Sequence, residues 1–168
     1  MPTLYVIRHG QPTLRGVLLG HADPPLSSLG RAQASAVRIP NCRLYSSPLR
    51  RARETAVILK PDPIILTDLA EISYGEWDGL TWDKIENRWP QLAQDKLRDW
   101  QSVVPPGGEP WDQFSGRVGR ALREIIRDPT PAAIVAHEAV NAVVDNYFAQ
   151  SAVDVYTQSY CEIKQYEF

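Results

Sequence analysis

The sequence predicts an α/β fold, a three-layer sandwich with a mostly parallel central sheet and helices on both faces. Two apolar stretches, 4–7 and 132–136, are continuous, as in strands buried on both faces of a parallel sheet. Between them, helical patterns alternate with further short apolar runs, which is typical of a sheet whose strands are joined by helices. A chain of 168 residues is long enough for one domain with a sizeable core. We therefore expect a single domain over residues 1–168.

Caps and helix breakers place the other elements of this fold. Short strands are expected at 44–45 and 64–66, and the alternating tail 160–168 predicts an edge or antiparallel strand. Residues 11–25 and 68–79 are rich in glycine and proline or in acidic and aromatic residues, and both are expected to be loops. We expect helices from Ser27 to Pro40, Pro48 to Pro61, Thr81 to about Arg88, Pro90 to about Trp100, about Pro110 to Arg127, and Ala139 to Phe148. The helices within 81–104 form an excursion over the strand ends.

Composition narrows the classes of partner. The formal net charge is −2 and the isoelectric point is about 5.9, so the chain lacks the basic field that nucleic acid or an anionic membrane surface attracts. No stretch approaches the length of a membrane-spanning segment. Cys42 and Cys161 are too few for a disulfide framework and lack metal-ligand spacing. We expect a cytoplasmic protein that binds neither nucleic acid nor membranes; its oligomeric state is left open.

Polar side chains follow both of the continuous apolar strands. Arg8 and His9 come directly after the first strand, and His137 comes directly after 132–136. Neighbouring parallel strands lie about 4.8 Å apart, so the two imidazoles can meet at one edge of the sheet. Ligands of open α/β sheets bind at this carboxyl edge, which makes it the expected place for a functional site.

Three further groups are expected at the same edge. The helix after Ser46-Ser47-Pro48 should direct free backbone N–H groups and its positive dipole end there, and its first turns carry Arg50 and Arg51. The acidic loop 68–79 brings Glu71 nearby. Two imidazoles, several guanidiniums and one carboxyl group form a pocket suited to a dianionic phosphate. Of the two arginines, Arg50 is expected to be the solvated one.

The motifs at these positions resemble those of the histidine phosphatase superfamily, the phosphoglycerate-mutase-like proteins. The resemblance extends over nearly the whole chain and keeps the family's order. The length and the loop that contains Glu71 are more similar to the small phosphatases, such as the α-ribazole phosphatases, than to the longer glycolytic mutases. The matching motifs are Arg8-His9-Gly10, Gly20-x-x-Asp23-x-Pro25-Leu26-Ser27-x-x-Gly30, Ser47-Pro48-Leu49-x-Arg51-Ala52-x-x-Thr55-Ala56, Glu71-x-x-x-Gly75-x-x-x-Gly79 and the late strand that ends at His137.

The resemblance implies a metal-independent phosphomonoesterase that needs no cofactor and acts on a small phosphorylated metabolite. In such an enzyme His9 attacks phosphorus and forms a phosphohistidine. Arg8 and Arg51 bind the phosphoryl oxygens together with His137, and Glu71 is the general acid and base. Two loop residues are possible substrate contacts, Arg15 and His21.

Two positions depart from the family's pattern, and they keep other interpretations open. Arg15 stands where the family usually has asparagine, and Glu138 stands where a glycine usually follows the second histidine. A carboxylate 4 Å from a phosphate charge is repelled by on the order of 4 kcal/mol at an effective dielectric constant of about 20. The alternatives are a phosphoglycerate mutase and a non-catalytic phospho-ligand binder. A metal site of His9, His21 and His137 is the weakest, because arginines crowd the same place.

Overall fold

A five-stranded sheet forms the centre of the protein in a computed structural model that describes residues 1–168. The strand order is β3-β2-β4-β1-β5, and every pairing is parallel except that of β5 with β1. The strands are β1 (Thr3–Arg8), β2 (Arg43–Ser46), β3 (Ile64–Ile65), β4 (Ala132–Ala136) and β5 (Ile163–Glu167). The mostly parallel sheet and the antiparallel edge strand near the C-terminus, both predicted from the sequence, are confirmed.

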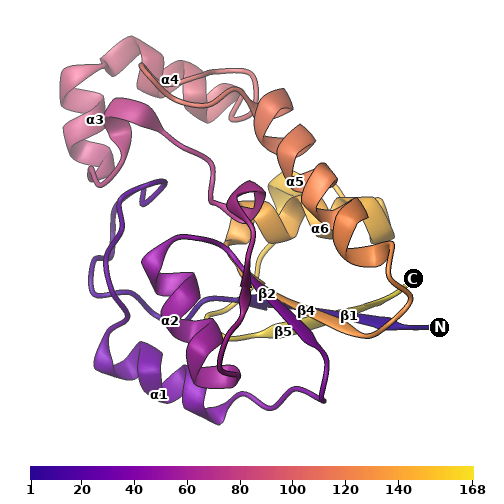
Figure 1. The fold of residues 1–168 in the computed structure, drawn as a ribbon. Helices are drawn as coiled ribbons and strands as arrows, with labels where there is room; N and C mark the ends of the chain where they lie inside the picture. Colours follow the sequence, from indigo (N-terminus) through magenta and orange to yellow (C-terminus); the bar gives the residue numbers. More distant parts are fainter.

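Helices cover both faces of the sheet (Figure 1). On one face lie α1 (Ser28–Ala36) and α2 (Arg50–Leu59), and on the other lie α5 (Trp111–Ile126) and α6 (Glu138–Ala149). Alternate side chains of the sheet face these two layers. Ile7, Leu44 and Val135 pack against α2, whereas Val6 and Ile134 lie in the core beneath α5 and α6. The predicted three-layer sandwich is therefore confirmed.

The inner stripe of α5 shows how the sequence pattern directs this packing. Phe114, Val118, Leu122 and Ile125 recur at helical spacing, and all four are fully buried in the larger core. Burial of a side chain of this size contributes about 1.5–3 kcal/mol. This stripe anchors α5 against the sheet and, with it, the segments that α5 holds in the functional site.

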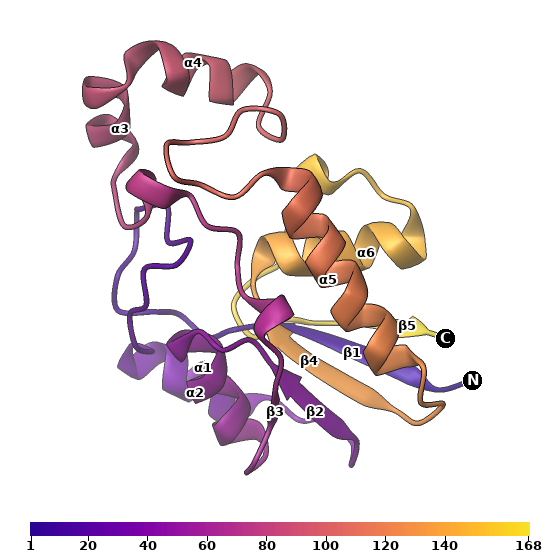
Figure 2. The ribbon, with the colours of Figure 1, turned by 45° about the horizontal axis from the view of Figure 1, so that its top comes forward.

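The excursion in 81–104 consists of α3 (Trp82–Arg88) and α4 (Pro90–Arg98), which lie away from the sheet beyond the strand ends (Figure 2). Thr81 caps α3 by accepting the backbone N–H of Lys84, as its position before the helix predicts. A separate small core centres on the fully buried Trp77 together with Ile85 and Ala93. Trp77 therefore has a packing role.

Three details differ from the expected elements. The helix predicted from Pro48 begins at Arg50, because Pro48 lies before the N-cap residue Leu49. The tail forms β5 only from Ile163, since a turn with Cys161 at φ 59° precedes it. The loop 68–79 contains the short 3₁₀ helix Gly75–Trp77, and another, Thr67–Leu69, leads into it.

We predict that Gly30→Ala destabilises the fold by about 1–3 kcal/mol, because a Cβ at Gly30 would lie 2.1 Å from the carbonyl oxygen of Gln11. Gly116→Ala is the matched control. It also lies in a helix, has nothing within 4 Å of the added Cβ, and should be neutral or stabilising by up to about 1 kcal/mol. Urea unfolding of both variants tests the pair, and equal stabilities would refute the close contact.

Candidate active site

The two histidines meet at the carboxyl edge of the sheet. In the parallel pairing of β1 with β4, Arg8 lies opposite Ala136, so His9 and His137 each follow the same level of the sheet. Their ring centroids are 5.2 Å apart and the rings are tilted by 58°. His9 is 3 % exposed and His137 is fully buried. The structure thus brings together two imidazoles that are 128 positions apart in the chain.

Hydrogen bonds define the tautomer of His9. Its Nδ1 lies 2.7 Å from the carbonyl oxygen of Gly10, which can only accept, so Nδ1 carries the proton and donates. The Nε–H of Arg51 donates to Nε2 over 3.3 Å. Burial, followed by the positive charges of Arg51 and Arg8, lowers the pKa of His9 to about 3. The ring is therefore neutral at physiological pH and keeps a lone pair on Nε2.

Arg51 is held by the loop 11–25. Its guanidinium donates to the carbonyl oxygen of Ala22 over 2.8 Å and to that of Gly20 over 3.0 Å. The residue is 1 % exposed, whereas the side chain of neighbouring Arg50 is 52 % exposed and pairs with Glu54. The interpretation of Arg50 as the solvated arginine is thus confirmed. The backbone carbonyls orient a buried cation toward His9.

Arg8 lies on the other side of His9. Its NH1 donates to the carbonyl oxygen of Gln158 over 2.6 Å, and its guanidinium carbon lies 4.4 Å from the centroid of the Tyr160 ring. Glu138, the residue in the family's glycine position, places a carboxylate oxygen 3.6 Å from NH2 of Arg8. The same carboxylate accepts the backbone N–H of Gln158 over 3.2 Å. Glu138 therefore pairs with the cation that the site requires.

Two buried nitrogens of the site have no hydrogen-bond partner within the protein, Nδ1 of His137 and Nε of Arg8. The other nitrogen of His137, Nε2, is 2.7 Å from the hydroxyl oxygen of Ser47. Burial, followed by the charge of Arg51, holds the pKa of His137 well below its usual range. Buried polar groups are normally satisfied, so these nitrogens indicate where a polar ligand binds.

Glu71 points toward the N-terminus of α6. One carboxyl oxygen is 3.0 Å from the backbone nitrogen of Ile72 and the other is 3.5 Å from that of Ala139. Burial raises the pKa of this carboxyl group despite the opposing effects of the backbone hydrogen bond from Ile72 and the charge of Arg51. Glu71 accordingly keeps its proton to a higher pH than an ordinary glutamic acid.

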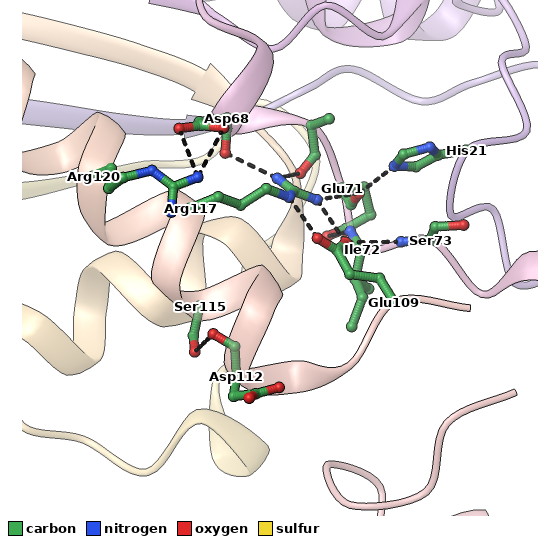
Figure 3. A network of polar contacts seen from close by, with 11 residues as sticks. His21, Asp68, Glu71, Ile72, Ser73, Glu109, Asp112, Ser115, Arg117 and Arg120 are labelled. Atoms are coloured by element: carbon green, nitrogen blue, oxygen red, sulfur yellow. Dashed lines mark hydrogen bonds and ion pairs between the residues drawn. The ribbon is translucent and has the colours of Figure 1, made fainter. Parts of the chain in front are cut away.

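Arg117 of α5 fixes the backbone on which Glu71 lies (Figure 3). Its guanidinium donates to the carbonyl oxygens of Asp68, Ala70 and Glu71 over 2.9, 2.6 and 3.0 Å. Both carboxylate oxygens of Glu109 accept from the same guanidinium, over 2.7 and 2.8 Å. A bidentate ion pair of this kind is rigid. Arg117 therefore positions Glu71 through the backbone carbonyls that it holds.

A cavity of 160 Å³ lies over His9. Its lining combines charged groups from distant parts of the chain with the tip of the loop 11–25 and two tyrosines. The lining residues are Arg8, His9, 14–20, Arg51, Glu71, Tyr74, Glu138 and Tyr160. The structure thus brings six of the sequence-predicted or discussed residues to one cavity, including Arg15, and places His137 directly behind His9.

Two expectations about this site concern His21 and the N-terminus of α2. His21 does not line the cavity: its Nε2 lies 2.7 Å from the carbonyl oxygen of Glu71, so the ring ties the loop to the Glu71 segment (Figure 3). At the N-terminus of α2, the backbone N–H of Arg50 is not free for a ligand. The carboxylate of Asp23 accepts the backbone N–H of Arg50 over 2.6 Å and thereby caps the helix. The first turns of α2 and α6 both reach the cavity, through Arg51 and Glu138.

Sequence reasoning missed Ser47, Tyr74, Tyr160 and Arg117 as parts of the site. Ser47 stood in a matched motif, next to the proline that precedes α2, and that was the available signal. The others come from a loop, a turn and a helix whose placement depends on tertiary packing. No group of three or more His, Cys, Asp or Glu side chains is arranged to hold a metal ion. None of the helices has both the length and the apolar composition required to cross a membrane.

The fold and site define the class of α/β proteins with paired histidines and arginines at the carboxyl ends of parallel strands. The family model described as "Histidine phosphatase superfamily (branch 1)" matches residues 4–167. The chain belongs to the histidine phosphatase superfamily, and the resemblance in its motifs is confirmed.

Similar proteins include phosphatases and mutases. A bifunctional protein of Mycobacterium tuberculosis is 36 % identical over 135 residues, which are 73 % of this chain and 37 % of that protein. An adenosylcobalamin/alpha-ribazole phosphatase of Salmonella typhimurium is 30 % identical over 150 residues, 82 % of this chain and 74 % of that protein. The structure of a phosphoglycerate mutase from Thermus thermophilus matches with a TM-score of 0.72 and 34 % identity, over 84 % of this chain and 81 % of that one. The chain thus spans only 37 % of the length of its mycobacterial relative.

We predict that His9 makes stability depend on pH. Between about 3 and 6.5, its pKa values in the folded protein and in a model peptide, the unfolded chain binds a proton that the folded protein does not. This residue therefore lowers the free energy of unfolding by up to about 1.4 kcal/mol for each pH unit below 6.5, and has no effect above it. Urea unfolding from pH 7.5 to 4 should show a shallower decline in His9→Gln than in the wild type. Parallel declines would contradict the buried neutral ring.

Proposed function

We propose that the protein is a metal-independent phosphomonoesterase that hydrolyses a small phosphorylated metabolite through a phosphohistidine on His9. The observation that carries this proposal is the neutral His9 ring, which keeps its Nε2 lone pair beside the buried guanidinium of Arg51. A nucleophile adjacent to fixed cations is what in-line attack on a phosphate dianion requires. The phosphatases among the relatives support the same reaction class.

In the first step Nε2 of His9 attacks phosphorus and the ester P–O bond breaks. Nδ1–H donates to Gly10, which stabilises the positive charge that develops on the ring. Arg51 and Arg8 line the cavity and offer N–H groups to the phosphoryl oxygens. His137, whose ring centroid lies 5.2 Å from that of His9, would donate from its unpartnered Nδ1 when that atom carries the proton. Glu71, whose raised pKa favours the protonated form, gives its proton to the leaving alkoxide.

In the second step water attacks the phosphohistidine. The Glu71 carboxylate formed in the first step accepts a proton from the water, the P–N bond breaks, and His9 returns to its neutral form. Inorganic phosphate is the second product. The two arginines provide the positive charge that a metal ion supplies in other phosphoryl-transfer sites, so the chemistry needs no divalent cation.

Glu138 influences the affinity of this site for phosphate. Its carboxylate lines the cavity and also pairs with Arg8, so a bound phosphate must share that arginine with an anion already present. This arrangement favours weak phosphate binding, and it is the observation behind the alternative of a non-catalytic phospho-ligand binder. If the wild type is inert and Glu138→Gly hydrolyses phosphate esters, that alternative replaces the proposal.

We predict that the purified protein hydrolyses p-nitrophenyl phosphate in the presence of EDTA and that His9→Ala abolishes turnover. Rapid acid-free quenching with a ³²P-labelled ester should trap label on His9 in the wild type. The reason is that His9 is the only histidine that lines the cavity, and its Nε2 lone pair faces the guanidinium of Arg51. Normal turnover by His9→Ala, or label on another residue, would refute the assignment.

A matched pair of arginine variants controls this experiment. Arg51→Ala should raise KM for the ester and lower kcat, whereas Arg50→Ala should leave both close to the wild type, because that side chain is exposed and lies outside the cavity. Product analysis with 3-phosphoglycerate separates the phosphatase from a mutase: isomerisation without release of inorganic phosphate would identify a mutase.

We predict that Glu71→Gln distinguishes leaving groups. Hydrolysis of an alkyl phosphate should fall by roughly 10²–10⁴-fold, because a poor leaving group needs the acid. With p-nitrophenyl phosphate the first step needs little protonation, so the variant should release a burst of nitrophenolate and then turn over slowly without the base. The wild-type rate for the alkyl ester should decline as pH rises through the raised pKa of Glu71, and this decline should vanish in the variant. Equal losses for both esters without a burst would exclude the acid–base role.

A further inference from the structure

A second cavity, of 420 Å³, adjoins the one over His9. The two share three wall residues, Glu71, Tyr74 and Glu138. If Glu71 protonates the leaving oxygen, the leaving group must pass Glu71, and the second cavity is the space beyond it. The residues that line this second cavity therefore indicate which kind of alcohol the substrate releases.

Aromatic rings form much of this second cavity. Tyr74 and Trp100 stand edge to face with centroids 6.3 Å apart, and Trp111 and Tyr156 complete the aromatic wall. Ala139, Ala142 and Val153 form the rest of its apolar lining. Aromatic faces attract cations, and they do so best in partly desolvated sites.

Three acidic side chains line the cavity: Glu71, whose raised pKa favours its neutral form, Glu138 and Asp154. Glu138 is offset by Arg8, but Asp154 forms no ion pair. No lysine, arginine or histidine lines the cavity. Two of the rings already have a lysine of the protein against them, since Nζ of Lys96 lies 4.9 Å from the Trp100 centroid and Nζ of Lys164 lies 3.8 Å from that of Tyr156. Tyr74 and Trp111 are the rings left for a cation of the ligand.

We propose that the leaving group carries an ammonium or quaternary ammonium group and no second acidic group. This inference rests on the proposed function, because it places the phosphate over His9 and the alcohol in the second cavity. The cation would lie against the aromatic wall with the carboxylate of Asp154 nearby. A leaving group with a carboxylate or a second phosphate would instead meet the acidic side chains of the lining and no basic residue among them, which disfavours phosphoglycerate as a substrate.

Matched esters test the charge of the leaving group. Phosphocholine and 3,3-dimethylbutyl phosphate have the same shape and differ by the positive charge, and 3-phosphoglycerate carries a negative one. We expect kcat/KM for phosphocholine to exceed that for the neutral ester by roughly 3- to 30-fold, the range of a cation–π contact. We expect 3-phosphoglycerate to be the poorest of the three. A neutral ester as good as phosphocholine, or a better 3-phosphoglycerate, would overturn the proposal.

Substitutions in the second cavity test whether the preference for the cationic ester arises there. Asp154→Asn and Trp111→Leu should each reduce the ratio of kcat/KM between phosphocholine and the neutral ester by at least twofold. Asp83→Asn is the control, because it removes the same charge from an exposed position on α3 outside both cavities. The ratio cancels changes that affect both esters, including partial unfolding. An unchanged ratio in both cavity variants would refute the proposed subsite.

A binding measurement separates this inference from the proposed function. Calorimetric titration with choline and with 3,3-dimethylbutanol measures the cavity without any reaction. If p-nitrophenyl phosphate is not hydrolysed but choline binds more tightly than the neutral alcohol, the phosphatase proposal fails and the cationic subsite stands. If hydrolysis occurs and the two alcohols bind equally, the phosphatase stands and the cationic subsite fails.

Discussion

The parallel pairing of β1 with β4 is the constraint on which the site depends. It puts His9 and His137 at the same level of the sheet edge, where their ring centroids lie 5.2 Å apart. The strands are buried on both faces, so their register is fixed by packing against two helical layers. A shift by one residue would exchange those faces and separate the rings. The chemistry of the site is thus set by the same contacts that stabilise the core.

Burial then gives each group its state. His9 and His137 are neutral because the protein removes them from water beside two fixed guanidiniums, and burial also raises the pKa of Glu71. Arginine suits this role, because it stays charged where a lysine would lose its proton. A site with fixed cations and neutral acids and bases can bind a dianion without ionising its own nucleophile.

The sequence predicted the fold well where the signal was local or periodic. The apolar runs at 4–7 and 132–136, the caps Ser27 and Thr81, and the stripe on α5 all lie where expected, since each is encoded within a few residues. The motifs also predicted several residues that line the cavity, among them Arg51 and Glu71. The contacts that could not be predicted join residues that are distant in the sequence. Asp23 reaches α2 from another loop, and His21 turns toward a backbone carbonyl, and neither event has a signature in the neighbouring residues.

The loop 11–25 contains no helix or extended strand, and it is attached both to the site and, through the pairing of Leu18 with Leu80, to the segment after it. Arg51 donates hydrogen bonds to the carbonyl oxygens of Gly20 and Ala22, and the ring of His21 is hydrogen-bonded to that of Glu71. Detachment of this loop would bring water to Arg51 and His9 at once, so local opening and loss of the binding site are a single event. An anion that binds between the arginines would stabilise the attached form of the loop. Hydrogen exchange and proteolytic cleavage would then be slower throughout this segment.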